Sequence, residues 1–305
     1  MNRSILGVAL VLISAACYGI MSILAVYAYR DGASVLGLLT IRFALAALLF
    51  WLFLVVSRTK ISLTLRQLLA MFILGGVLYA AMSFTFFTAV QYISPSLAAL
   101  LLYSYPVFVA VLSAVVDKER LTRRIVLSLV LAMAGLVLVL GTSFADVSPI
   151  GVILGVVSAV LYSIYIVLSN RVVKSVPSVV TSASVTLFTA LSLATVSLST
   201  NQLQLHFHTQ AWLAIGGIIL FPTIIAMVAF FYGLRIIGST KASILSMIEP
   251  LVTITASALL IGDRLTPAQC VGGTAVLLGA LLVMLKQSED RSNVRNEKSR
   301  SSHVD

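Results

Sequence analysis

The sequence has little charge and few of the residues that catalysis or metal binding would use. Of its 305 residues only 10% are charged, against about a quarter in soluble domains, and 60% are hydrophobic. So little polar surface cannot cover a protein in water, which excludes an ordinary soluble enzyme. Cys17 and Cys270 each lie within an apolar run, so neither a disulfide nor a metal site is indicated.

Motifs for metal, cofactor or nucleotide chemistry are also missing. His206 and His208 are two residues apart, with no carboxylate or thiol nearby. No phosphate-binding loop, hydrolase or metalloprotease pattern occurs. We therefore expect no metal, no cofactor, no ATP hydrolysis and no enzymatic activity.

The net charge is nevertheless +10. The basic residues lie in short gaps between long apolar runs, and no basic run is interleaved with aromatic side chains. We therefore predict no nucleic-acid partner, because this arrangement is typical of a polytopic membrane protein embedded in a lipid bilayer.

Ten apolar runs are each long enough to cross the hydrocarbon layer as a helix, which takes about 20 residues. Strands of a membrane barrel would instead alternate over about ten residues. The sequence therefore predicts an all-α membrane protein with ten transmembrane helices and no soluble domain. We place the spans at residues 5–28, 36–57, 67–90, 96–116, 124–141, 150–169, 179–199, 212–234, 240–261 and 267–286. The polar tail at 287–305 we expect to be disordered.

The positive charge is distributed unequally between the two sides of these spans. Counting Lys and Arg in alternate gaps gives 17 on one side and two, Arg30 and Arg264, on the other. Cytoplasmic loops are enriched in Lys and Arg. We expect both termini to be cytoplasmic in a protein of the cell (inner) membrane.

The chain repeats itself after 144 residues. A gap-free shift of that length places Phe86, Pro106, Arg120 and Gly135 on Phe230, Pro250, Arg264 and Gly279, and Gly7 and Tyr18 on Gly151 and Tyr162. We define two five-helix repeats, residues 1–145 and 146–286. Because five is odd, the second repeat must enter the membrane upside down, and the opposite charge bias of matching loops agrees. Inverted repeats are typical of transporters that work by alternating access around a central site.

Each half also carries the same local pattern. A Phe-rich span ends in a short turn, and a small-residue span with a central proline follows. An acidic-Arg-Leu-Thr turn then leads into the last span, Glu119–Thr122 in one half and Asp263–Thr266 in the other. This resembles the tandem EamA-type repeat of the drug/metabolite transporter superfamily, over roughly residues 5–286. The resemblance implies a permease with a central cavity between its halves. Its relatives export amino acids and other small metabolites, and more distant ones carry nucleotide sugars or sugar phosphates.

Glu249 is the acidic residue deepest in a span, about 12 Å beyond Lys241 along a helix. A charge at that depth is costly and usually faces a cavity or a partner. One interpretation is a proton-titratable or substrate-binding carboxyl group. The other is a helix-packing residue. The same shift places Tyr105 opposite it, so the acid is not duplicated.

Arg42 and two prolines are further candidates. Arg42 lies about six residues into the second span, where it either snorkels to the interface or clamps a carboxylate. Pro106 and Pro250 each remove a helix hydrogen bond, which produces either a gating kink or a static one. Tyr18, Tyr79 and Tyr162 share helix faces with serines or glycine, a pattern that suits a cavity wall.

Together these patterns predict a permease that moves a small organic metabolite outward by alternating access, and the family resemblance implies an amino acid or a related compound as the substrate. Tyr18, Arg42, Tyr79, Tyr162 and Glu249 are its predicted substrate-binding residues, and protons are a candidate second partner. A nucleotide-sugar or sugar-phosphate exchanger is one alternative, and a polytopic receptor or structural protein is another. The sequence leaves the oligomeric state open.

Overall fold

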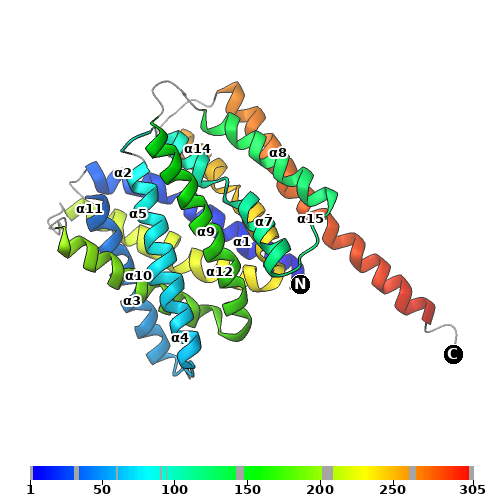
Figure 1. Ribbon diagram of the computed structural model, residues 1–305, viewed down its shortest axis with the longest axis horizontal. Helices are drawn as coiled ribbons and strands as arrows, with labels where there is room; N and C mark the ends of the chain where they lie inside the picture. Colours follow the sequence, from blue (N-terminus) through cyan, green and yellow to red (C-terminus); the bar gives the residue numbers. More distant parts are fainter. Residues whose placement is uncertain are drawn as a thin grey trace.

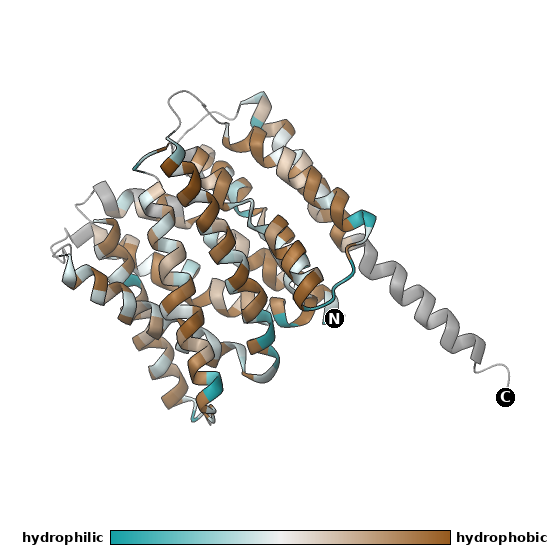
Figure 2. Cartoon of the chain, in the orientation of Figure 1, coloured by the Kyte–Doolittle hydropathy of each residue, from teal (hydrophilic) through white to brown (hydrophobic). Residues whose placement is uncertain are grey.

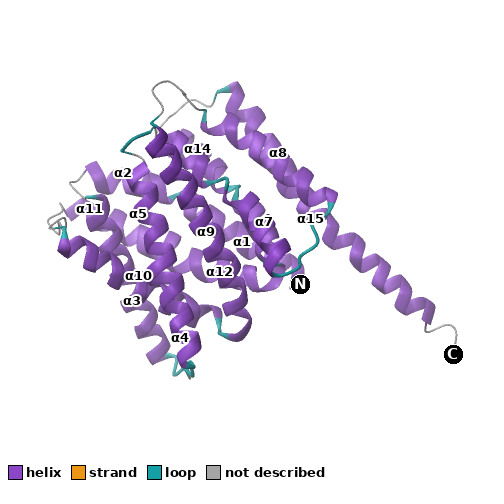
Figure 3. Ribbon diagram, viewed as in Figure 1, coloured by secondary structure: helices purple, strands orange, loops and turns teal. Residues whose placement is uncertain are grey.

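The computed structural model describes residues 3–30, 34–59, 61–89, 91–93, 95–141, 148–200, 209–260 and 266–301. All regular structure in these ranges is helical (Figure 3). Ten helices within them are long and apolar enough to cross a membrane. They are Arg3–Ala25, Val35–Val56, Leu65–Phe86, Leu97–Val116, Arg123–Leu140, Pro149–Ser175, Ser178–Ser199, Ala211–Ile237, Ser239–Leu259 and Pro267–Met284. Each overlaps one predicted span, so the prediction of ten helices is confirmed.

Several spans are divided into shorter elements. The first half comprises α1 (Arg3–Gly19), α2 (Met21–Arg30), α3 (Val35–Val56), α4 (Leu65–Met71), η1 (Phe72–Tyr79), α5 (Ala80–Ala89), α6 (Pro95–Leu102), α7 (Tyr105–Val116) and α8 (Arg123–Leu140). The second comprises α9 (Pro149–Ser175), α10 (Ser178–Ser199), α11 (Thr209–Ile218), η2 (Ile219–Ile225), α12 (Ala226–Ile237), α13 (Ser239–Ser246), α14 (Glu249–Leu260) and α15 (Pro267–Ser301).

The two halves break their helices at matching places. The third span of each contains a π-helical segment, η1 or η2. The fourth span of each is interrupted just before its proline, because a proline has no N–H to continue the helix. At these breaks Ser104 N–H donates to Leu101 O at 3.2 Å, and Ile248 N–H donates to Leu245 O at 3.2 Å. Both residues of the second bond are those of the first shifted by 144, so the duplication extends to single hydrogen bonds.

The packing of the helices shows the same correspondence between the two halves. Helix α3 packs against its own counterpart α10, and α8 packs against α15 along one edge of the bundle (Figure 1). Helix α1 packs against α12, while its counterpart α9 packs against α5, the counterpart of α12. The halves are therefore related by a pseudo-twofold rotation. With five spans in each half, that rotation makes them inverted repeats, as the sequence predicts.

Glycine contacts show the pseudo-symmetry at atomic scale. A Cβ atom on Gly7 would lie 2.7 Å from side-chain atoms of Ile236 and Ile237, and one on Gly151 would lie 2.7 Å from Ile93. Ile93 shifted by 144 is Ile237. Where α8 meets α15, a Cβ on Gly135 would lie 2.4 Å from a backbone oxygen of the partner helix. Only glycine allows backbones to approach so closely.

The outer surface of the bundle is apolar, as Figure 2 shows for most helices. Large hydrophobic side chains that are exposed there include Leu65 and Leu213, each 82% exposed. In water such a surface would promote association, whereas a bilayer provides it with a matching solvent. The chain is an integral membrane protein whose partner on this surface is the lipid bilayer.

The end of the chain continues the last span. Helix α15 runs to Ser301, and the disorder expected for the tail at 287–305 stays a prediction. The segment 287–301 contains neither proline nor glycine and is rich in Glu, Lys and Arg, which are good helix formers. A span that is already helical supplies the nucleus, so the extension needs no new nucleation. Residues 302–305 lie outside the described part, as do His206, His208 and the Asp263–Arg264 turn.

Candidate functional site

A cavity of about 130 Å³ lies at the centre of the bundle, between the two halves. It is lined by Tyr18, Met21, Leu39, Arg42, Phe43, Tyr79, Met82, Ser83, Phe86, Leu102, Tyr103, Tyr105, Tyr162 and Glu249. The structure thus brings together all five side chains that the sequence nominates for substrate binding, from α1, α3, η1, α9 and α14. Pro106 and Pro250 do not line the cavity, but each directly follows a residue that does.

The walls of the cavity are mainly aromatic. The Tyr79 ring lies 5.6 Å from Phe43 and 5.2 Å from Tyr165, centroid to centroid. The Tyr105 ring meets Tyr162 edge-on at 4.6 Å. Contacts in this range stabilise ring pairs and fix their orientation. The result is an aromatic box in a defined shape, with hydroxyl groups that can bind a polar solute.

Sequence reasoning missed Tyr103, Tyr105 and Phe86 as lining residues. Tyr103 and Tyr105 flank the break before Pro106, where helical spacing no longer predicts which side chains share a face. One signal was nevertheless present for Tyr105. The 144-residue shift places it on Glu249, and the pseudo-twofold brings both positions to the same central cavity.

Arg42 is the basic residue of the cavity, and it does not snorkel to the interface. It is 3% exposed, and its Nε donates a hydrogen bond of 2.7 Å to Thr223 Oγ1. Its guanidinium also contacts Met21 Sδ at 2.9 Å and the Pro222 carbonyl at 3.4 Å. Since Thr223 and Pro222 lie in η2, the π-helical segment of the second half holds the cation of the first. The interpretation as an interfacial side chain is wrong, and the carboxylate clamp stays a prediction.

Glu249 is the acidic residue of the cavity. It is the first residue of α14, which begins after the break at Met247 and Ile248. A helix N-terminus carries a partial positive charge that stabilises a nearby carboxylate. Tyr103 lines the same cavity as this carboxyl group. Among the described residues Glu249 forms no direct ion pair with Arg42, so a cation and a separate carboxyl group face one small space.

A second, larger space of about 870 Å³ adjoins the central cavity. We call it the vestibule. It lies between α3, α5 and α10, near the ends where α3 begins and α10 finishes, and includes Ser34, Gln91 and Thr200. Leu39 and Ser83 line both spaces, so the vestibule lies directly beside the central cavity.

The opposite end of the bundle is packed differently. Helix α12 packs against both α9 and α10. Its counterpart α5 has no comparable packing against α1 or α3 among the described residues. The pseudo-symmetry is therefore broken in one respect: α12 packs on α9 and α10 at this end, whereas the vestibule lies between α3, α5 and α10 at the other.

The described residues contain no group of three His, Cys, Asp or Glu side chains that could hold a metal ion. What the central site offers is instead one cation, one carboxyl group, several phenol hydroxyls and apolar ring faces. This chemistry suits the binding of an organic solute.

Comparison with known proteins agrees with this geometry. Residues 5–141 and 149–285 each match the model of the EamA-like transporter family. An "Uncharacterized transporter" of Archaeoglobus fulgidus is 34% identical over 199 residues, 65% of this chain and 70% of that protein. "Uncharacterized transporter YcbK" of Bacillus subtilis is 26% identical over 287 residues, 87% of this chain and 88% of that protein.

A solved structure described only as "Crystal structure of protein" has a TM-score of 0.81. It covers 93% of this chain and 99% of its own, at 19% sequence identity. At that identity the likeness concerns the fold alone.

Proposed function

Because the chain belongs to the EamA-like transporter family, we propose that this membrane transporter is a secondary permease for a small amino-acid-like metabolite, working by alternating access. The observation that carries the proposal is the central cavity, where Arg42 and Glu249 face one aromatic space, with the vestibule beside it toward one end of the bundle. A site of this kind, exposed to one side at a time, is what alternating access requires.

The charges of the cavity favour a dipolar solute. The Arg42 guanidinium can bind a carboxylate through parallel hydrogen bonds. Glu249 can accept hydrogen bonds from an ammonium group, and tyrosine faces attract cations. The cavity volume of about 130 Å³ limits the solute to a compact molecule.

Exchange of sugar phosphates or nucleotide sugars is the less favoured substrate class. A phosphate group carries up to two negative charges and is usually bound by more than one basic side chain. The described lining offers Arg42 as its basic residue and sets Glu249 against it. A phosphorylated solute would have to approach that carboxyl group.

Orientation and direction form part of the same proposal. Because 17 Lys and Arg residues lie on the side of both termini, those termini lie on the cytoplasmic side of the cell (inner) membrane. The vestibule then opens outward, which suits a solute released to the outside. Glu249 would carry the proton if export is driven by the proton gradient.

Counterflow in proteoliposomes tests the proposal. Vesicles preloaded with unlabelled leucine, tyrosine, glutamate or glucose 6-phosphate are diluted into the same labelled compound, and trapped label is measured against empty liposomes. We expect trapping for at least one zwitterionic amino acid and none for glucose 6-phosphate. Trapping of glucose 6-phosphate alone would favour the exchanger. A protein that is folded and monodisperse yet traps none of these probes contradicts the proposed substrate class.

A further inference from the structure

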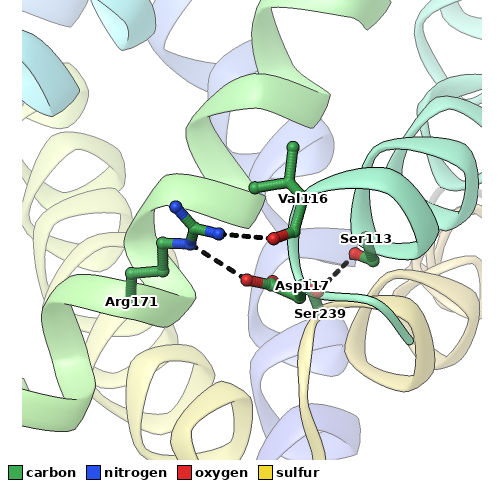
Figure 4. A network of polar contacts seen from close by, with 5 residues as sticks. All are labelled: Ser113, Val116, Asp117, Arg171 and Ser239. Carbon is green, nitrogen blue, oxygen red and sulfur yellow. Dashed lines mark hydrogen bonds and ion pairs between the residues drawn. The ribbon is translucent and has the colours of Figure 1, made fainter.

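Figure 4 shows a network of polar contacts that joins the two halves. It lies where α7 and α9 end and α13 begins, at the end of the bundle opposite the vestibule. Arg171 on α9 donates through Nε to Asp117 Oδ1 at 2.9 Å and through Nη2 to the Val116 carbonyl at 2.7 Å. The hydroxyls of Ser113 and Ser239 are hydrogen-bonded at 2.7 Å. Each of these bonds joins a residue of the first half to one of the second.

One more bond extends the network along the start of α13. Thr240 Oγ1 donates to Glu119 Oε2 at 2.8 Å. Ser113, Ser239 and Thr240 are all fully or almost fully buried, at 0%, 1% and 0% exposure. We call the six side chains of this network the end latch: Ser113, Asp117, Glu119, Arg171, Ser239 and Thr240.

The local sequence explains why the turn after α7 presents two carboxylates to two different helices. Lys118 adopts a positive φ of 53°, which ends the helix in the left-handed region. The N–H groups of Asp117 and Glu119 both donate to the Ser113 carbonyl, at 3.0 and 3.1 Å. Arg171 then reaches the carbonyl end of α7, where a helix favours a positive charge.

The opposite end of the bundle cannot form the same ion pair. The 144-residue shift places Tyr27 at the position of Arg171 and Ile261 at that of Asp117. The Asp117–Arg171 pair therefore has no counterpart at the equivalent positions, although the surrounding scaffold is duplicated. An ion pair present in one conformation and missing from the conformation related by the pseudo-twofold shifts the equilibrium between them.

We propose that the end latch is the gate that keeps this end closed while the vestibule is open, and that it must break before the solute can leave or enter there. This inference rests on alternating access, the proposed function. The latch biases the resting protein toward the conformation seen here, with the vestibule accessible. Its bonds supply the differential stability between the two forms.

A pair of equivalent serines marks the two routes. Ser34 lines the vestibule. Its counterpart Ser178 is 2% exposed, and its hydroxyl has no hydrogen-bond partner among the described residues. A buried hydroxyl without a partner is unfavourable, and it would regain water if the closed route opened. Exchange of the two conformations exposes Ser178 and buries Ser34.

Thiol labelling measures that exchange directly. Cys17→Ser and Cys270→Ser give a background to which Ser34→Cys or Ser178→Cys is added, and labelling by N-ethylmaleimide is timed in proteoliposomes. To each we add Asp117→Asn, Thr240→Val or, as the matched control, Arg120→Gln, which changes an exposed charge in the same turn. Asp117→Asn should speed labelling of Ser178→Cys about fivefold or more and slow that of Ser34→Cys. Thr240→Val should act in the same direction, and Arg120→Gln should change neither rate.

Charge reversal provides a second test that does not depend on the asparagine variant. Asp117→Arg alone should speed labelling of Ser178→Cys, and adding Arg171→Asp should return the rate toward the parent value. Unchanged labelling of Ser178→Cys in every latch variant would overturn the proposal. Faster labelling at both serine positions would overturn it too, because a loosened bundle is not an exchanged one.

The labelling needs no transported solute, so its outcome is separate from that of the counterflow experiment. If labelling becomes faster at Ser178→Cys and slower at Ser34→Cys while no probe shows counterflow, the proposed substrates are contradicted and the latch is retained. Counterflow without the shift would retain the permease and reject the latch.

Discussion

The two halves of this protein share a scaffold but not a chemistry. Helix breaks, π-helical segments and glycine contacts recur at the 144-residue spacing, down to equivalent hydrogen bonds at Ser104 and Ile248. The charged residues of the cavity do not recur, because Arg42 corresponds to Thr186 and Glu249 to Tyr105. Duplication therefore accounts for the scaffold that the halves share. Single substitutions within one copy give the cavity its charged groups, and variants at equivalent positions can separate the two contributions.

The largest effect should come from Arg42. Arg42→Met keeps an unbranched side chain, although a shorter one, and removes the charge that Thr223 and the Pro222 carbonyl hold in place. Because hydrogen bonds to charged groups contribute up to about 3 kcal/mol, we expect counterflow of the accepted amino acid to fall roughly 100-fold.

Thr186→Val is the matched control at the equivalent position. Thr186 Oγ1 bonds within its own helix to Ser182 O at 2.7 Å and does not line the cavity. Counterflow should stay near the parent rate. Equal losses in the two variants would assign Arg42 to packing rather than to the solute.

Glu249→Gln should have the next largest effect and should act on coupling. If the carboxyl group carries the proton, the variant still exchanges solute but loses accumulation driven by a pH gradient. A gradient of one pH unit corresponds to about tenfold accumulation per coupled proton, so about that factor should disappear. Accumulation is measured in proteoliposomes with an imposed gradient, alongside exchange without one.

Tyr105→Phe, at the equivalent position, is the control for Glu249. The substitution keeps the ring, removes the hydroxyl and leaves the Glu249 carboxyl group in place. We therefore expect accumulation driven by the pH gradient to persist. An unchanged pH dependence of flux in Glu249→Gln would reject the proton-carrier hypothesis and leave the carboxyl group a structural or substrate-binding role.

The smallest effect should come from substitution of the two prolines. These variants allow a direct comparison of the helix breaks in the fourth and ninth spans. Pro106→Ala and Pro250→Ala each restore an N–H and favour a continuous helix. We expect Pro250→Ala to slow exchange at saturating solute about two- to fivefold, and Pro106→Ala less, because Pro250 follows the charged Glu249. Thermal unfolding in detergent is recorded in parallel. Small, equal changes in exchange accompanied by higher thermal stability would identify both breaks as static kinks.

Much of the fold could be predicted because a bilayer imposes a simple rule on composition. Long apolar runs, the charge bias of the gaps and the repeated prolines each have a direct physical cause, and together they predict the ten spans. The π-helical segments could not be predicted in this way. Residues 72–79 have the pattern of an ordinary apolar helix, and the contacts of this segment with α10, such as the bond of 3.0 Å from Thr189 Oγ1 to the Gly75 carbonyl, join residues far apart in the sequence.

The site was predictable in part for a related reason. A buried charge or a mid-span tyrosine is rare enough to stand out, and Tyr18, Arg42, Tyr79, Tyr162 and Glu249 do line one cavity. Their roles stay predictions. The partners of Arg42 could not be predicted, because Thr223 is 181 residues away and contacts Arg42 only through the exchange of helices between halves.

The packing of α1 against the second half has a consequence for biogenesis. Gly7 leaves the ribosome well over 200 residues before Ile236 and Ile237, the side chains it fits against. Helix α1 must therefore stay in the lipid without its packing partner α12 until most of the chain has been inserted. A nascent chain that stalls after the fifth span would expose the helix surfaces of α1, α3 and α8 that pack against the second half. Membrane chaperones and quality-control proteases could recognise those surfaces.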